Sequence, residues 1–260
     1  MTTARAGAAP TQASREDLEI RFWSESPDEA PGADSVPAFT NKMAEARVVL
    51  EKFDAFDALL RNAGTIVEVG GGQCWVSCLL RKRYGDAVRV IGSDIAPDAV
   101  ASVPEWERIF RVRLDGALAC RSYDLPFQTG SIDVLLVFAA AHHFGAHRRT
   151  LREVHRVLKP GGTALYLHEP ACPRALHRLA RKRVMAKRPV VPEDVLVHSR
   201  LCALARDARL GTKLVFSPTT TNRGPMQTVY YLGLQKLPFL QRWLPCSIDF
   251  VFTKGDDIIL

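Results

Sequence analysis

The regular hydrophobic pattern of the chain begins near residue 40. Apolar residues at positions 49, 53, 56 and 60 recur at helical spacing, which predicts an amphipathic helix capped by Asn41 and stopped by Gly64. Beyond Gly64, short apolar runs alternate with helical patterns. The predicted strands are 65–69, 88–94, 117–122, 132–140, 163–169, 212–217 and 247–253. The further predicted helices are 73–84, 97–103, 105–112, 148–158, 174–188 and 193–209, and residues 223–245 are predicted to be irregular.

Strands separated by helices indicate a parallel sheet that is covered on both faces. The run LLVF at 135–138 has no polar side, so its strand is predicted to lie near the centre of the sheet. No internal repeat divides the chain, and we expect one α/β domain over residues 37–260. Residues 1–36 are rich in Ala, Thr, Ser, Pro and Gly and are predicted to be a disordered tail, except that Phe22 and Trp23 need something to pack against.

The net charge of +7 comes from one segment of the sequence. Residues 174–188 contain seven Lys or Arg and no acid, with Leu176, Leu179, Ala180 and Val184 along one face of the predicted helix. Such a helix is suited to an anionic membrane, an acidic partner or RNA phosphates, or simply packs its apolar face on the sheet. No aromatic residues are interleaved with the charges, so we rank a membrane or an anionic substrate above nucleic acid.

Two features predict a cytoplasmic protein. The first residues contain no apolar core of an export signal, and the longest apolar run, 134–141, is far too short for a membrane helix. The six cysteines are irregularly spaced, which favours reduced thiols over a disulfide framework.

Three consecutive glycines follow the first predicted strand, in the stretch VEVGGGQCW. Glycines at this place let the backbone turn tightly and come close to a ligand, although a tight turn without a ligand is the alternative. A dinucleotide fingerprint would need glycine where Trp75 or Gln73 stands, and no Gly-Lys-Ser/Thr follows to make a phosphate loop. Asp94 ends the second strand, where a carboxylate accepts hydrogen bonds from a ribose diol.

Four motifs follow one another in the order found in a known enzyme family: VEVGGG, GSDIAPDAV, YDLPFQTGSIDVLLVFAAAHHF and LREVHRVLKPGGTALYL. Together they resemble the class I S-adenosylmethionine-dependent methyltransferases, closest to the subfamily of quinone-biosynthesis and small-molecule enzymes. The resemblance implies a Rossmann-like, doubly wound, seven-stranded sheet that is mostly parallel with an antiparallel last strand. It also implies a cofactor-binding core over residues 64–168 and substrate-side helices and loops over residues 169–245.

The resemblance also implies the residues that hold S-adenosylmethionine. Asp94 would bind the ribose hydroxyls and Ile95 would pack on the adenine. The remaining expected cofactor-binding residues are Glu68, Gly70, Gly72, Arg121, Ser122 and Ala139. The sequence departs from the family pattern at Cys74, where the family usually has a third glycine, at Gln73, and at Arg121, where an acid often meets the adenine.

The candidates for catalysis follow the fourth and fifth strands: His142, His143, His168 and Glu169. Alignment of the acceptor with the activated methyl group is the main requirement, and a general base helps when the acceptor must lose a proton. Each candidate is a base or a structural residue, and we expect no metal because the usual helical ligand spacing is absent.

The acceptor is predicted to be an oxygen or carbon atom of a small apolar or aromatic metabolite. The stretch AAAHHF lacks the [DNS]-P-P-[FYW] loop of enzymes that methylate nucleobase amino groups. Apolar and aromatic residues after residue 169 are suited to such an acceptor, or cover the sheet: Val229, Tyr230, Tyr231, Leu232, Phe239 and Trp243. A cofactor-binding module without turnover is a further alternative.

Overall fold

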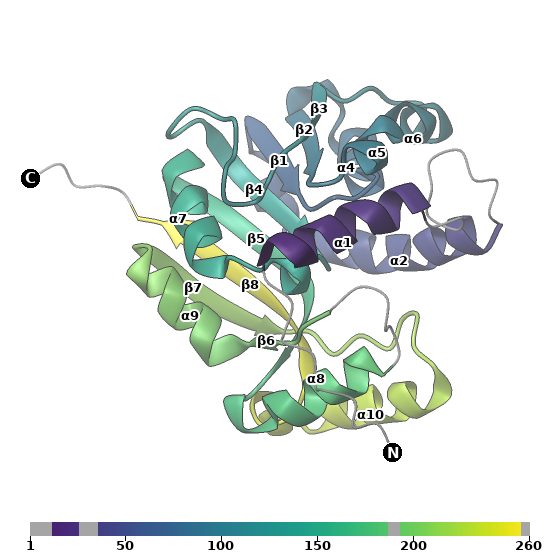
Figure 1. Cartoon of the computed structure of the whole chain (residues 1–260), viewed down its shortest axis with the longest axis vertical. Helices are drawn as coiled ribbons and strands as arrows, with labels where there is room; N and C mark the ends of the chain where they lie inside the picture. The colour runs from purple at the N-terminus through teal and green to yellow at the C-terminus, as the bar shows by residue number, and fades with distance from the viewer. Residues whose placement is uncertain (1–11, 26–35, 187–192, 256–260) are drawn as a thin grey trace, which may run out of the picture.

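The computed structural model describes residues 12–25, 36–186 and 193–255. Its strands form one sheet in the order β3-β2-β1-β4-β5-β8-β7, with the short β6 beside the end of β5 (Figure 1). The strands are β1 Thr65–Val69, β2 Arg89–Asp94, β3 Gly116–Ala119, β4 Ile132–Phe138, β5 Leu158–Cys172, β6 Leu196–Val197, β7 Leu210–Phe216 and β8 Cys246–Lys254. Strands β1 to β5 pair in parallel, whereas β8 is antiparallel to both β5 and β7. The predicted Rossmann-like sheet with an antiparallel last strand is confirmed.

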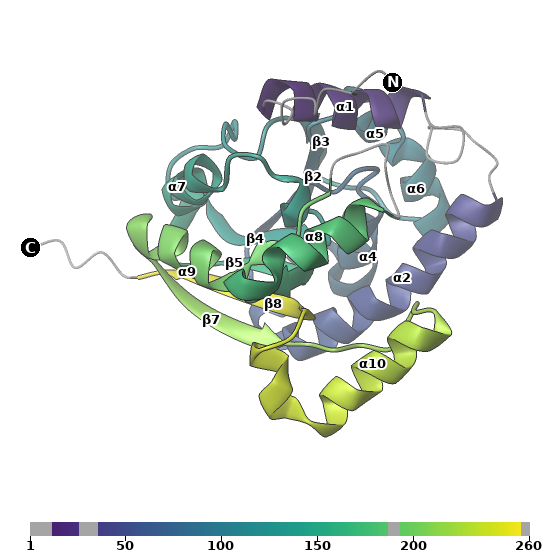
Figure 2. The same ribbon diagram turned by 60° about the horizontal axis from the view of Figure 1, so that its bottom comes forward.

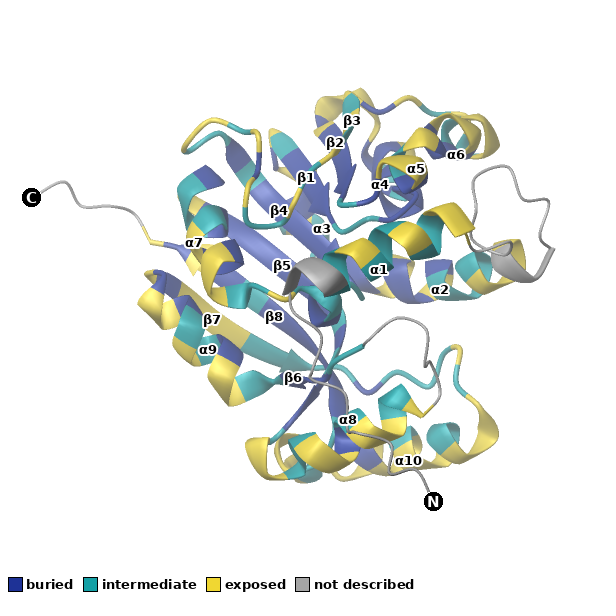
Figure 3. Ribbon diagram, viewed as in Figure 1, coloured by how far each residue is buried: buried dark blue, intermediate teal, exposed yellow. Residues whose placement is uncertain are grey.

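Helices cover both faces of this sheet (Figure 2). They are α1 Gln12–Glu25, α2 Val36–Ala55, α3 Asp57–Arg61, α4 Trp75–Tyr84, α5 Pro97–Ala101, α6 Val103–Phe110, α7 His147–Val157, α8 His177–Met185, α9 His198–Asp207 and α10 Pro225–Lys236. Strand β4 shows why two layers form: Val134 and Leu136 join the core under α2, α4 and α6, while Leu135 and Val137 join the core under α7 and α9. Its continuous apolar run is buried on both faces, as the sequence predicted, and the strands near the middle of the sheet are accordingly mostly dark blue in Figure 3, whereas β7 at one edge is exposed or half-buried over most of its length.

Four elements differ from the sequence predictions. In the helix predicted over residues 193–209, residues 196–197 form β6 and helix α9 begins only at His198. Residues 12–25, which were predicted to be unstructured, form α1. The helix predicted from Asn41 begins instead at Val36, and it is interrupted at Phe56 before α3 continues the apolar stripe. Residues 225–236 form α10 rather than irregular structure. Residues 1–11 and 26–35 of the predicted tail lie outside the described part of the chain.

Candidate active site

The predicted cofactor residues come from one edge of the sheet. Strands β3, β2, β1 and β4 are neighbours and run in the same direction, so the residues that follow them meet at their carboxyl ends. The structure therefore places the glycine turn, Asp94, Arg121 and Ala139 at a common edge. Helix α1 lies across this edge and contacts α5 (Figure 1).

The glycine turn is too tight for side chains. A Cβ atom on Gly71 would lie 2.7 Å from Cδ of Glu68, and one on Gly70 would lie 3.0 Å from Cβ of Ala140. Gly70 and Gly72 also have φ angles of 72° and 54°, a left-handed conformation that glycine adopts without a steric cost. The turn therefore needs its glycines for conformation as well as for space.

Asp94 is buried at the end of β2 and closes the turn. Its Oδ2 accepts a 2.7 Å hydrogen bond from the N–H of Gly72, and its Oδ1 accepts a 2.9 Å bond from the N–H of Ala96. Burial raises the pKa of this carboxyl to about 6, against the lowering effect of these backbone bonds. The backbone N–H of Ile95 also bonds to this carboxylate, so of its roughly four lone-pair sites about one remains to accept from a ribose hydroxyl. The position and chemistry of Asp94 thus fit the ribose of S-adenosylmethionine.

Glu68, near the end of β1, connects the glycine turn to helix α4 through hydrogen bonds. It is fully buried, and its Oε2 accepts bonds from the backbone N–H of Ser77, at 2.9 Å, and from the Ser77 hydroxyl. Burial raises the pKa of Glu68 to about 7. These bonds tie the end of β1 to the first turn of α4, and a direct contact of Glu68 with the cofactor stays a prediction.

Cys74 adopts the backbone conformation that favours glycine. Its φ is 55°, in the left-handed region, although its side chain is completely buried. The side chain fills the space over β2, because a Cβ atom on Gly92 would lie 2.7 Å from both Cβ and Sγ of Cys74. The preceding Gln73 accepts a 2.9 Å bond from the indole N–H of Trp106. The two departures from the family pattern are therefore accommodated by local packing.

Glu169 holds the turn after β4. Its Oε1 accepts from the N–H groups of Ala140, at 2.9 Å, and Ala141, at 2.8 Å. Its Oε2 lies 3.1 Å from the N–H and 2.9 Å from the ring Nδ1 of His142. A carboxylate offers about four lone pairs, so these four contacts saturate it. Glu169 therefore anchors the 3₁₀ turn η2, Ala141–His143, and orients the His142 ring.

The two remaining histidine candidates differ in charge environment. Nδ1 of His143 lies 3.3 Å from Oε2 of Glu19 on α1, and although burial opposes protonation, Glu19 and other carboxylates raise the pKa of His143. The ring of His168 stacks on Phe138, with centroids 5.8 Å apart, and its Nδ1 has no partner among the described residues. Burial, followed by nearby positive charge, lowers the pKa of His168 to about 3, so its ring is neutral near pH 7.

Helix α1 supplies site residues that the sequence patterns did not identify. Glu16 accepts a 2.8 Å bond from the hydroxyl of Tyr123 and a 3.0 Å bond from Nε of Arg121. Trp23 lies directly against Gly72, since a Cβ atom there would be 2.7 Å from its ring. The only sequence signal for this contact was the presence of aromatic residues in an otherwise polar segment.

A third side chain joins the two histidines of η2. One ligand-type atom of each of His142, His143 and Glu193 lies within 4.8 Å of the other two. Glu193 was not a predicted site residue, because it comes 50 positions later in the chain than His143 and only the fold brings it here.

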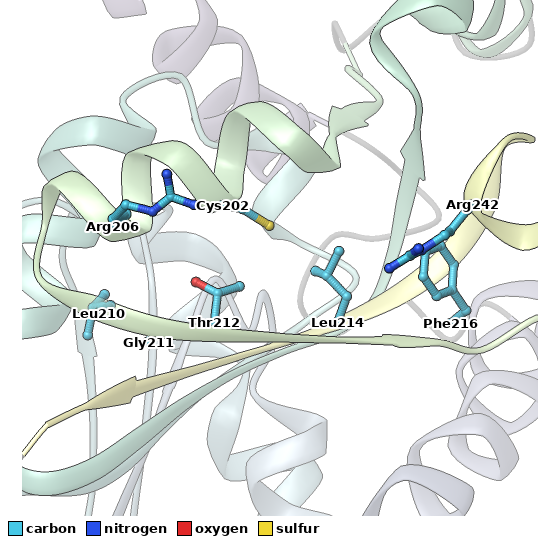
Figure 4. A pocket seen from close by; sticks show the side chains of 8 residues that line it. All are labelled: Cys202, Arg206, Leu210, Gly211, Thr212, Leu214, Phe216 and Arg242. Atoms are coloured by element: carbon cyan, nitrogen blue, oxygen red, sulfur yellow. The ribbon is translucent and has the colours of Figure 1, made fainter.

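A surface pocket of about 530 Å³ lies elsewhere, between β7 and α9 (Figure 4). Arg206 and Arg242 contribute its positive charge and Leu214 and Phe216 its apolar wall. Strands β4, β5 and β8 separate β7 from β1 in the sheet, so this pocket is distinct from the edge that carries the glycine turn.

Comparisons with known proteins agree with this geometry. Residues 67–166 match a family model described as a methyltransferase domain. A demethylmenaquinone methyltransferase of Thermus thermophilus is 28% identical over 134 residues, which are 49% of this chain and 59% of that relative, less than two thirds of its length.

Solved structures extend the similarity of the fold to nearly the whole chain. The geranyl diphosphate C-methyltransferase of Streptomyces coelicolor A3(2), in complex with Mg²⁺, geranyl diphosphate and S-adenosyl-L-homocysteine, superposes with a TM-score of 0.68 at 14% identity, covering 94% of this chain and 100% of that one. A putative sarcosine dimethylglycine methyltransferase from Galdieria sulphuraria has a TM-score of 0.58 at 15% identity, covering 93% and 98%. Residues 67–166 of this chain thus match a methyltransferase domain, and the sheet has the Rossmann-like strand order that the sequence motifs predicted.

Proposed function

We propose that this protein transfers a methyl group from S-adenosylmethionine to an oxygen or carbon atom of a small apolar or aromatic molecule. The observation that carries the proposal is the juxtaposition of the glycine turn with the buried carboxylate of Asp94. Gly70 and Gly72 leave the backbone open to a close ligand, and Asp94 presents an acceptor for a ribose hydroxyl. Ile95, Arg121, Ser122 and Ala139 stay proposed contacts at the same edge.

The cofactor would supply a methyl group already activated on a sulfonium, so the protein mainly has to align the acceptor. The proposed residues for this task are His142, in the turn after β4, and His168, at the irregularity within β5. His142 is fixed by Glu169, and His168 is neutral and packed against Phe138. We propose that the acceptor lies against these rings and that His142 takes its proton where one must be lost.

Isothermal titration calorimetry with S-adenosylhomocysteine tests the cofactor site. Asp94→Asn should weaken binding about 10- to 100-fold, because a hydrogen bond to a charged group contributes roughly 1.5–3 kcal/mol. Asp98→Asn, an exposed change in the first turn of α5, is the matched control and should bind as the unmodified protein does. No binding by the unmodified protein at millimolar cofactor would refute the proposal.

The relative named a demethylmenaquinone methyltransferase supports a prenylated quinol as the first acceptor to assay, and the geranyl diphosphate enzyme supports an isoprenoid diphosphate as the second. Transfer of labelled methyl to either compound identifies the class. Cofactor binding without transfer to any member of a wider panel of phenols and quinols would favour the non-catalytic alternative.

A specific surface favours contact with an anionic membrane as a second component of the function. Large apolar side chains are unusually exposed on α10, on the 3₁₀ helix η4, Pro238–Arg242, and at the residue after it. They are Met226 82%, Val229 70%, Phe239 67% and Trp243 71% exposed. Helix α8 lies on the same side of the molecule, with exposed basic residues and Leu179 60% exposed (Figures 1 and 2). Arg183 of α8 also acts electrostatically on Tyr230 of α10.

This combination of apolar groups and cations is typical of interfacial binding to anionic lipid. Of the basic segment 174–188, the structure describes residues 174–186, and Lys187 and Arg188 lie outside the described residues. Within the described part, no helix is both long enough and apolar enough to span a bilayer. We propose that the surface of α8, α10 and η4 rests on the membrane and gives access to an apolar acceptor dissolved there.

Co-sedimentation with vesicles tests the membrane surface. Binding should require phosphatidylglycerol in phosphatidylcholine vesicles, and it should fall at high salt. Phe239→Ser with Trp243→Ser should abolish it, whereas Ile109→Ser, at an exposed apolar residue of α6, should not. Equal binding by both variants, or binding of single-stranded RNA in preference to vesicles, would contradict this component.

A further inference from the structure

Three side chains with metal-ligand chemistry converge beside the glycine turn. His142 and His143 come from η2, and Glu193 comes from the segment that leads into β6. One ring nitrogen of each histidine and one carboxylate oxygen of Glu193 all lie within 4.8 Å of one another. Bonds of about 2.0–2.2 Å place the ligand atoms of a tetrahedral zinc ion roughly 3.5 Å apart, so a small rotation of these side chains brings them around one ion.

The contact of His142 with Glu169 fixes the orientation of its ring. Its Nδ1 lies 2.9 Å from Glu169, whose other contacts are all with backbone N–H donors. Because the carboxylate accepts, the matching tautomer of the ring has its N–H on Nδ1 and its lone pair on Nε2. Ligand histidines in proteins almost always donate their second ring nitrogen to a carboxylate or carbonyl in this way.

The second ring has a related arrangement. Nδ1 of His143 lies 3.3 Å from the carboxylate of Glu19 and has no good hydrogen bond within the described chain. The two rings are neighbours, with centroids 4.3 Å apart. Glu19, Glu169 and Glu193 thus surround the pair with negative charge, which favours a cation between them.

We propose that His142, His143 and Glu193 bind a single divalent transition-metal ion of the Zn²⁺ or Co²⁺ class. Two imidazole nitrogens and one carboxylate oxygen suit these ions better than Mg²⁺ or Ca²⁺, which prefer all-oxygen ligands. Three protein ligands leave at least one coordination position open, which is typical of catalytic rather than structural zinc sites. This inference replaces the expectation from sequence that no metal binds, which assumed helical ligand spacing.

The location indicates a role for the ion. Ala140, the residue just before η2, lies against Gly70 of the glycine turn. The three proposed ligands therefore adjoin the proposed cofactor edge. In this extension, which rests on the proposed function, the open position takes an oxygen of the methyl acceptor. The ion would then lower the pKa of that hydroxyl, and His142 would act as a ligand instead of a base.

Metal binding can be measured without cofactor or acceptor, so its outcome is independent of the proposed function. Untagged protein is stripped with a chelator and titrated with Co²⁺ while the visible ligand-field absorption is recorded. We expect one equivalent to bind, Zn²⁺ to displace it, and Glu193→Gln to weaken it at least about tenfold. Glu193 is only half-buried, so this variant should fold normally. Glu105→Gln, at an exposed residue of α6, is the matched control.

Three results would overturn the proposal. They are the absence of a ligand-field spectrum, equal Co²⁺ affinity in the Glu193→Gln and Glu105→Gln variants, and a thiolate charge-transfer band showing that cysteines bind the ion instead. If the metal site holds but S-adenosylhomocysteine does not bind, the proposed function fails and the metal site stands.

Discussion

Gly72 lies where the glycine turn contacts helix α1. Replacing it by alanine has two energetic effects, which a comparison with a second glycine separates. The residue has a φ of 54°, and its new Cβ atom would lie 2.7 Å from Cζ2 and 2.8 Å from Cη2 of Trp23. Gly72→Ala therefore introduces both an unfavourable backbone conformation and a steric clash with α1.

A second glycine isolates the backbone effect. Gly130 has a φ of 64° and open space around the position of a Cβ atom. A left-handed conformation costs an alanine roughly 1–2 kcal/mol, so Gly130→Ala should lower the free energy of unfolding by about that amount. Gly72→Ala should show the same loss and, in addition, a steric cost. Moving the Trp23 ring by about an ångström, or releasing α1, should cost about 1–3 kcal/mol more, as overpacking does.

The assay combines urea denaturation with limited trypsin cleavage at Arg15 and Arg21, both on α1. We expect faster cleavage at these sites in Gly72→Ala than in Gly130→Ala, because only the former pushes α1 away from the turn. Adding Trp23→Ala to both should abolish this difference, since it removes the ring that the new Cβ atom meets. Equal cleavage of the two single variants would refute the contact between α1 and the glycine turn.

Three further variants test the buried interactions around the site. Lys52→Met should cost about 3–5 kcal/mol in urea denaturation because it leaves the buried carboxylate of Asp249 without its partner at 2.6 Å. Lys52→Met with Asp249→Asn should recover much of the loss, because asparagine is neutral and still offers an acceptor to the backbone N–H of His168. Gly92→Ala should destabilise the protein by about 1–3 kcal/mol through contact with Cys74, and Cys74→Gly in the same chain should restore it, whereas non-additivity near zero would exclude direct contact. The pKa of Glu68 is raised to about 7, so the native state holds this proton more tightly than the unfolded chain does. The stabilisation from this proton is therefore complete below pH 4.5 and is lost as the pH rises to 7. Glu68→Gln should therefore remove a decline of up to about 3 kcal/mol in the free energy of unfolding over this range, and an unchanged pH profile would count against the shift.

Local patterns were sufficient to predict the sheet and the strand ends at which the proposed cofactor residues meet. The apolar run of β4 can be buried on both sides only near the centre of a sheet. Asp94 ends a strand, so it lies at the carboxyl edge of the sheet independently of how the helices pack. Glycine turns are likewise determined by local backbone geometry, and even the unusual Cys74 takes the left-handed conformation that a glycine would have.

Features that depend on distant parts of the chain could not be predicted in this way. Helix α1 has little amphipathic pattern of its own, and it is stabilised by contacts of Glu16 and Trp23 with the turn and with Tyr123. The convergence of Glu193 with the histidines depends on the path of the chain after α8. No spacing in the sequence encodes a contact across 50 residues.

The role of Glu169 shows why a suitable residue type on the right strand is insufficient to assign a base. A base must offer a free lone pair to the substrate proton, and all four lone pairs of Glu169 face donors of η2. Protonating it would break at least one of these bonds and release the turn that holds His142. We therefore propose that proton removal uses His142 or an ion bound there rather than Glu169. The two differ in their pH dependence, because a histidine base stops working once its ring is protonated, whereas a metal-bound acceptor responds to chelators and to the identity of the ion.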